Sequence, residues 1–268
     1  MCDKNRIAKY ARDARAIGRE KRVRVCAWLF RWGYCDRNII ALVGGDDVKF
    51  GWRLANEGLL FKVEHPNRKK AMYVLTQAGV DLAINSLLDL LDKRDASLDY
   101  PYLKDRRLTW DLTDHHNYVQ EAMIRLGCHC AVGSDNWFSE SELADGSSGA
   151  KPDGQININT SKVCIEVENG GKSDDSRKLQ MWQRMEALSK GECTHIMWIC
   201  ITGKAFLAIK RELAKDVCVM VYKDKHSRMV VMPELGEPMA KLKAASTVIY
   251  LSDMDKDIVD RFFNKWKS

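Results

Sequence analysis

The segment 151–168 constrains the fold more than any other, because its side chains alternate strictly between two characters. Val163, Ile165 and Val167 are apolar, whereas Cys164, Glu166 and Glu168 occupy the positions between them. Alternation with a period of two predicts a strand with one buried apolar face. Ile156 and Ile158 repeat that face in the preceding run. We therefore expect strands at 154–159 and 162–168, joined as an antiparallel hairpin with one acidic face.

The pairing within this hairpin predicts a cluster of carboxylates. If Thr160 and Ser161 form the loop, Asp153 lies opposite Glu168 and diagonal to Glu166. Such cross-strand neighbours lie within about 5–8 Å. Three carboxylates this close repel one another unless a cation joins them, and oxygen ligands without His or Cys suit Mg²⁺ or Mn²⁺. A bound divalent ion activates water at phosphodiesters, which makes this a candidate nuclease site. The alternative is a solvated sheet edge that happens to carry acids.

Short motifs in this segment resemble the PD-(D/E)xK nuclease superfamily. Pro152-Asp153 matches its first element and Glu166-Val167-Glu168 its second, but Glu168 stands where the usual lysine would be. The lysine is then absent or comes from elsewhere, either Lys172 or Lys178 on the predicted helix 174–189. The resemblance implies a restriction-endonuclease-like core in which Asp153 and Glu166 hold the metal. Glu168 would be a further ligand or a base, and the lysine would stabilise phosphate charge.

The first part of the chain follows the element order of a winged helix-turn-helix. Apolar periodicity and turn residues predict helices at 22–33, 37–43 and 48–57, then strands at 59–64 and 71–75. The segment YVLTQAG, which begins in the second strand and runs past the end of the hairpin, resembles the end of such modules in bacterial regulators. In these domains the third helix enters the major groove. The alternative is a winged helix that binds protein instead of DNA. Our candidate residues for contacts with base edges are Lys49, Arg53 and Asn56. Our candidates for contacts with phosphates are Arg68, Lys69 and Lys70.

The distribution of charge supports a polyanionic partner. Residues 1–95 carry 19 basic and 12 acidic side chains, and the whole chain has a net charge of +6. The positive excess therefore lies entirely in the first part of the chain, as expected for a nucleic-acid-binding module. No apolar run approaches the length of a membrane span, and the N-terminus lacks a secretory pattern. We expect a cytoplasmic protein without membrane insertion, whose nine cysteines are reduced.

A polar stretch at 96–111, which contains Pro101, separates the two patterns. We expect an α/β protein of two domains: a winged helix at 1–95 with its basic N-terminal segment, and a mixed sheet flanked by helices at 112–268. The stretch 96–111 would be the linker.

The arrangement as a whole resembles the MobC-type relaxases of mobilisable plasmids and the related replication-relaxation proteins. The resemblance rests on the winged helix, His115-His116-Asn117, the PDG at 152–154 and the string IEVENGGKS that follows. It implies a site- and strand-specific nick at a plasmid transfer origin, on double- and single-stranded DNA. A coupling ATPase and accessory relaxosome proteins would be partners in conjugative mobilisation.

The residues leave the nucleophile and the exact activity open. His116 is a candidate for binding phosphate or protonating the leaving oxygen, and Tyr118 is a candidate nucleophile in place of water. A DNA-binding regulator with an inactive nuclease-like domain is one alternative function. A simple site-specific endonuclease is the other.

Overall fold

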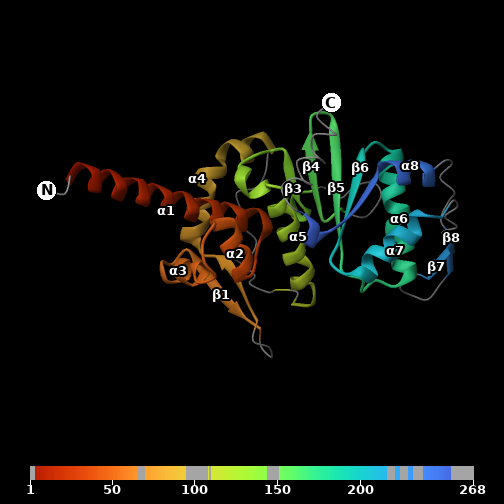
Figure 1. Ribbon diagram of the computed structural model, residues 1–268, viewed down its shortest axis with the longest axis horizontal. Coiled ribbons are helices and arrows are strands. Elements are labelled where there is room, and N and C mark those ends of the chain that lie inside the picture. Colours follow the sequence, from red (N-terminus) through yellow and green to blue (C-terminus); the bar gives the residue numbers. More distant parts are fainter. Residues whose placement is uncertain are drawn as a thin grey trace. The chain divides into compact units, whose positions relative to one another are not determined.

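The computed structural model describes residues 4–65, 70–94, 108, 110–143, 151–215, 221–223, 229–231 and 238–254 (Figure 1). The fold is mixed α/β, and the chain divides into two compact units, Met1–Asp135 and Asn136–Ser268. The linker expected at 96–111 lies largely outside the described residues. The division comes later than we expected, so the helix after that stretch belongs to the first unit.

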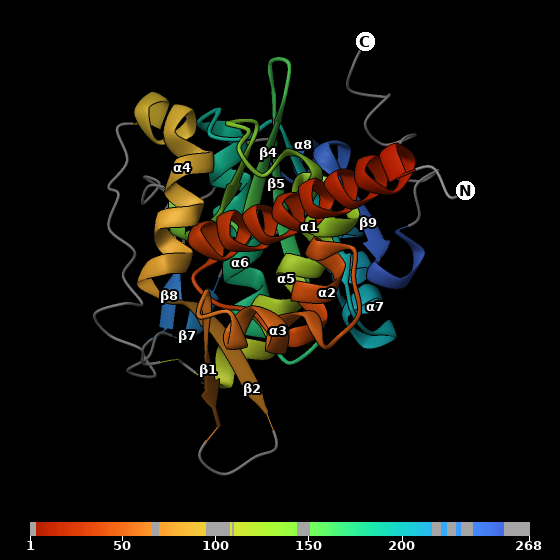
Figure 2. The ribbon, with the colours of Figure 1, turned by 90° about the vertical axis from the view of Figure 1, so that its left-hand side faces the viewer.

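The first unit consists of helices and one two-stranded sheet (Figures 1 and 2). The order of helices and strands predicted between residues 22 and 90 is confirmed. The first helix begins much earlier than predicted, since its first turns are rich in Ala, Arg and Lys and form helix without an apolar stripe. The elements are α1 (Lys4–Trp32), α2 (Arg37–Gly44), α3 (Phe50–Asn56), β1 (Leu60–Glu64), β2 (Ala71–Leu75), α4 (Gln77–Arg94) and α5 (Thr113–Arg125).

Side-chain caps fix the turns on either side of α2. Asp36 is the N-cap, and its Oδ1 accepts hydrogen bonds from the amides of Asn38 and Ile39 at 2.8 and 3.0 Å. Gly45 ends the helix with φ at 56°, a left-handed conformation that costs glycine little. Asp47 then accepts a bond from the Lys49 amide at 2.7 Å, which orders the turn that leads into α3.

A buried hydrogen-bond relay docks α5 inside the first unit. Gln120 of α5 is fully buried; its Oε1 accepts from Trp28 Nε1 and its Nε2 donates to the Tyr34 carbonyl, both at 2.8 Å. A buried amide with both ends satisfied specifies one position for its helix. This relay explains why α5 groups with α1 and not with the strands that follow it in the sequence.

Gly79, in the first turn of α4, allows the helix to approach the chain at Leu59. A Cβ placed on Gly79 would lie 2.2 Å from the Leu59 carbonyl oxygen and 3.0 Å from Leu75 Cδ2. We expect Gly79→Ala to lower the free energy of unfolding by about 1–3 kcal/mol, because the backbone at Leu59 must shift. Urea unfolding measures the loss. Gly133→Ala is the matched control, since its added methyl meets only the Ser86 carbonyl, at 3.5 Å. Equal stability of the two variants would contradict the close approach.

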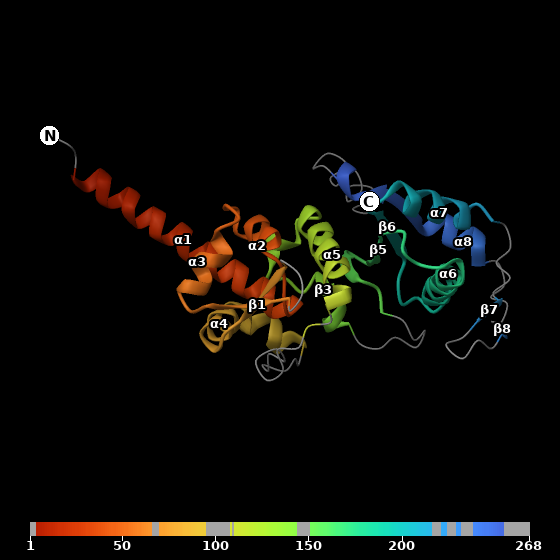
Figure 3. The ribbon, with the colours of Figure 1, turned by 90° about the horizontal axis from the view of Figure 1, so that it is seen from below.

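The second unit is built on a mixed five-stranded sheet (Figures 1 and 3). Its order is β3-β4-β5-β6-β9: the first two pairings are antiparallel, and the pairings of β5 with β6 and of β6 with β9 are parallel. The strands are β3 (Trp137–Ser139), β4 (Gly154–Ile158), β5 (Ser161–Glu168), β6 (His195–Cys200) and β9 (Ser246–Tyr250). A short hairpin, β7 (Val221–Lys223) and β8 (Met229–Val231), is separate from this sheet.

Three helices contribute to one core over this sheet: α6 (Asp174–Ser189), α7 (Gly203–Leu213) and α8 (Pro238–Ala245). Met181, Ile209 and Leu242, one from each helix, pack in a cluster with Trp198 and Cys200 of β6. The boundaries of α6 are those predicted, whereas β3 and α8 were not predicted. Within the part of the chain that the structure describes, no helix combines the length and apolar character needed to cross a membrane.

Candidate functional site

The hairpin β4–β5 carries the predicted acids, with a register that differs from the one we expected. The turn is Asn159-Thr160, with Asn159 left-handed at φ 53°, and Ile158 pairs with Ser161. The predicted loop at Thr160-Ser161 was therefore wrong. The pairing shifts by two residues, and an even shift keeps every side chain on its predicted face.

The shifted register changes which carboxylates are neighbours. Gly154 pairs with Ile165, so the next step of the ladder sets Asp153 beside Glu166 instead of Glu168. Asp153 Oδ2 accepts a hydrogen bond from the Val167 amide at 2.7 Å, which anchors it to β5. The residue before β4 is thus tied to the strand that carries both glutamates.

Glu166 is buried, with Oε2 hydrogen-bonded and Oε1 in an ion pair that lacks hydrogen-bond geometry. It is 2% exposed, Arg184 Nε lies 2.5 Å from its Oε1, and Gln180 Nε2 donates to its Oε2 at 2.6 Å. Burial raises the pKa of Glu166 to about 7 because desolvation and the nearby Asp153 charge outweigh the attraction of Arg184. The alternative of a solvated acidic edge is therefore wrong for Glu166. It is also wrong for Glu168, which is 1% exposed.

Of the two candidate lysines, Lys172 contacts the acidic face. Its Nζ lies 2.6 Å from Glu168 Oε1, and that pair has one buried and one partly exposed member. Lys178 instead lies 3.4 Å from Asp175 Oδ1, within its own helix. The structure thus brings together Asp153, Glu166, Glu168 and Lys172. We refer to these four with Gln180 and Arg184 as the acidic cluster.

Sequence reasoning missed the polar face that α6 presents to β5. Arg177, Gln180 and Arg184 recur at helical spacing and are all buried. Arg177 holds the chain before the helix by donating to the Lys172 carbonyl at 3.1 Å, and Arg184 donates to the Lys151 carbonyl at 2.9 Å. The i, i+3, i+7 spacing of these long polar residues was the signal in the sequence that could have identified this face.

The cluster compensates much of its negative charge with its own cations. Arg184 lies against Glu166, and Lys172 lies against Glu168. Oxygen donors of this kind suit Mg²⁺ or Mn²⁺ in chemistry. However, among the described residues no three His, Cys, Asp or Glu side chains are arranged to hold one metal ion. A metal ion at these carboxylates would have to compete with Arg184 or Lys172.

His116 and Tyr118 belong to α5 in the first unit. His116 Nε2 lies 3.0 Å from the Trp32 carbonyl oxygen, and its ring stacks on Tyr34 with centroids 4.4 Å apart. These contacts hold the imidazole among aromatic rings of its own unit. Tyr118 is half-buried.

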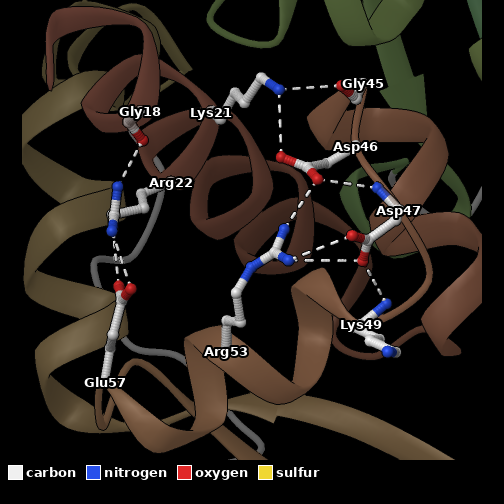
Figure 4. Close-up of polar contacts among 9 residues, drawn as sticks. All are labelled: Gly18, Lys21, Arg22, Gly45, Asp46, Asp47, Lys49, Arg53 and Glu57. Carbon is white, nitrogen blue, oxygen red and sulfur yellow. Dashed lines mark hydrogen bonds and ion pairs between the residues drawn. The ribbon is translucent and has the colours of Figure 1, made fainter. Parts of the chain in front are cut away.

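The predicted DNA-binding residues of α3 are in different environments (Figure 4). Lys49 and Asn56 are exposed. Arg53 is held by two aspartates of the preceding turn, with 2.7 Å from its NH2 to Asp46 Oδ1 and 3.2 Å from its NH1 to Asp47 Oδ2. The Asp47 amide, together with Lys21 and Arg53, lowers the pKa of Asp46 to about 2. Asp46 therefore stays charged at physiological pH and remains paired with Arg53.

A hollow of about 820 Å³ opens beside α3, and we call it the α3 groove. It lies between the start of α2, the start of α3 and the strands β1 and β2. Sequence reasoning did not single out three of its side chains, Arg37, Trp52 and Lys62. Lys70, predicted at the hairpin tip, also lines it and forms an ion pair with Asp114 at 2.6 Å. Arg68 and Lys69 lie outside the described residues.

Comparisons of the whole chain with protein-family models, with curated proteins and with solved structures found no match.

Proposed function

We propose that this protein binds DNA and nicks one strand, with the acidic cluster as the site of phosphodiester cleavage. The observation that carries the proposal is the pair of buried glutamates of β5, Glu166 and Glu168, with Asp153 anchored beside them and Lys172 in contact with Glu168. Carboxylates paired with a lysine at one sheet position are the groups that metal-dependent phosphodiester hydrolysis uses. The resemblance to PD-(D/E)xK nucleases rests on the same residues.

Each residue of the cluster has a role in this proposal. Asp153 and Glu166 would hold Mg²⁺ or Mn²⁺, which when bound neutralises phosphate charge and lowers the pKa of water. Glu168 is a further ligand or a base for the attacking group. Lys172 places a positive charge beside Glu168 and would stabilise the negative charge that develops on the phosphate. Gln180 and Arg184 hold Glu166 in one orientation.

The first unit supports DNA as the substrate. Three helices followed by a hairpin have the element order of a winged helix-turn-helix, in which the third helix reads the major groove. Lys49 and Asn56 are exposed on or next to α3, and the positive excess of the chain lies in residues 1–95. We infer that this unit selects the site that the second unit cuts.

Conjugative mobilisation is the process we propose for the nick. The resemblance to MobC-type relaxases implies cleavage at a plasmid transfer origin, with a coupling ATPase and accessory relaxosome proteins as partners. A relaxase must conserve the energy of the broken bond so that the strand can be resealed, which requires a nucleophile such as Tyr118. Hydrolysis by water would make the protein a simple site-specific endonuclease.

A nicking assay tests the proposal. Supercoiled plasmid carrying the DNA that flanks the gene is incubated with the protein in Mg²⁺, in Mn²⁺ and in EDTA. We expect open-circular product with a metal ion and none in EDTA. Transfer of the cut strand to a second oligonucleotide would identify a relaxase, and a free 5′ or 3′ end without transfer would identify an endonuclease.

A DNA-binding regulator with an inactive second unit is the alternative, and one observation favours it. The ion pairs of Glu166 with Arg184 and of Glu168 with Lys172 already compensate the buried acids, so the fold tolerates them without a metal ion. Duplex binding at a defined site without nicking in either metal would select this alternative.

Lys49 provides a separate test of the DNA-binding surface. It is exposed and forms no ion pair with any residue that the structure describes. If it neutralises one phosphate, Lys49→Ala should reduce the slope of log K against log salt by about 0.9. The slope is measured by fluorescence anisotropy with duplex DNA at salt concentrations between about 50 and 200 mM. Lys190→Ala is the control, and equal slopes for the two variants would remove Lys49 from the interface.

A further inference from the structure

An exposed indole stands out on the surface of α3. Trp52 is 58% exposed, and Val48, four residues earlier, is 49% exposed. Both line the α3 groove. Val48 lies in the turn before α3 and Trp52 on the helix, and because both line the same groove they form an apolar strip there. Exposure of so large an aromatic surface is unfavourable unless something covers it.

The groove is lined by four cations and by two acids, Asp36 and Glu64, and this net positive charge favours an anionic ligand. Arg37 and Lys49 line the groove and form no ion pair with another residue of the described chain. Lys62 and Lys70 also line it, but they lie 2.6 Å from Glu64 and from Asp114, respectively. An aromatic ring beside unpaired cations is the combination that proteins use to stack a base while contacting the neighbouring phosphates.

Neither the arginine nor the indole of α3 is well arranged for reading a paired base. Arg53, the one arginine of α3, is engaged by Asp46 and Asp47 on the preceding turn (Figure 4). Trp52 has a single N–H donor, whereas base-edge recognition uses bidentate donors and acceptors. An indole instead offers a flat face. That face can stack on a base only where the base is not already stacked between its neighbours in a duplex.

We propose that the α3 groove binds an unpaired DNA base, which stacks on Trp52 while its flanking phosphates contact Arg37 and Lys49. The inference rests on the proposed DNA-processing function and deepens it. The first unit then recognises single-stranded or locally melted DNA, the form in which a nicking protein meets its substrate strand. The groove of about 820 Å³ is large enough for a nucleotide.

The test compares binding of single-stranded and duplex DNA by the full chain. Fluorescence anisotropy uses one oligonucleotide of about 20 nucleotides, either single-stranded or annealed to its complement. The buffer contains EDTA so that no cleavage occurs. We expect Trp52→Ala to weaken single-strand binding by about 5- to 150-fold, the range for loss of one stacked base, and to change duplex binding by less than about 2-fold. Trp52→Phe keeps a flat ring and should retain most of the affinity. Leu42→Ala is the matched control, because Leu42 is a 48% exposed apolar side chain that does not line the groove.

The other outcomes overturn the inference. An equal loss for single strand and duplex would mean that Trp52 contacts a paired base. No loss for either DNA, or no single-strand binding by the wild type, would mean that the groove serves another ligand. Nicking is measured separately in Mn²⁺. If the protein nicks but fails this binding test, the inference is wrong and the proposed function stands. If it passes the binding test but never nicks, the proposed nicking function is wrong and the binding of an unpaired base stands.

Discussion

Asp153→Asn and Glu166→Gln should each reduce nicking of supercoiled plasmid by about 100-fold or more while leaving duplex binding within about 2-fold of the wild type. Both substitutions keep the side-chain volume and remove one negative charge from the acidic cluster. The loss follows because these carboxylates would hold the divalent ion. Binding survives because the candidate DNA-binding residues belong to the first unit, whereas the cluster belongs to the second.

The control for this pair is Glu186→Gln. Glu186 is on the same helix as Gln180, and it forms an ion pair with Lys190 at 2.8 Å, away from the cluster. The substitution removes one carboxylate charge from the second unit without changing the proposed site, so the Glu186→Gln variant should nick at the wild-type rate. Rates are read from the open-circular fraction over time. Parental activity in Asp153→Asn or Glu166→Gln would show that cleavage occurs elsewhere.

The lysine of the site can be identified in the same assay. Lys172 contacts Glu168, whereas Lys178 pairs with Asp175 of its own helix. A lysine that stabilises phosphate charge must lie at the acidic cluster, so we expect Lys172→Met to slow nicking by at least about 10-fold. Lys178→Met should leave the rate unchanged. The reverse result would assign the role to Lys178 and require a different arrangement of α6 during cleavage.

The sequence predicted the faces of the hairpin but not its register. Alternation at 163–168 depends only on a period of two, so it identified Glu166 and Glu168 as sharing a face. Register depends on the turn, and we placed the loop one residue too late. Asn159 carried the missed signal, since asparagine tolerates the left-handed backbone that a two-residue hairpin turn requires.

Tertiary partners were beyond the reach of sequence patterns. Helical spacing grouped Arg177, Gln180 and Arg184 on one face of α6, but nothing local specifies which strand residue that face meets. We expected a cation to join the acids, and the structure supplies Arg184 and Lys172. Similarly, the sequence around Gln120 did not predict its buried hydrogen bonds to Trp28 and Tyr34, which assign α5 to the first unit.

The buried pair of Arg184 and Glu166 should make the second unit sensitive to the loss of either partner alone. Both side chains are almost fully buried, and Arg184 Nε lies 2.5 Å from Glu166 Oε1. Removing one partner leaves a buried charge without compensation. We therefore expect Arg184→Met to lower the free energy of unfolding by about 3–5 kcal/mol. Lys190→Met, which breaks the exposed pair with Glu186, should cost less than about 1 kcal/mol.

A double variant separates the charge from the packing. Arg184→Met combined with Glu166→Leu removes both charges and keeps apolar volume in the site, so it should recover at least half of the stability lost in Arg184→Met. Urea unfolding of the full chain measures the change, and hydrogen exchange of the β5 amides identifies the transition of the second unit. If Arg184→Met costs no more than Lys190→Met, the pair does not hold α6 against β5. The apolar contacts of α6 would then hold the acidic cluster in place, and the position of the Glu166 side chain would not depend on Arg184.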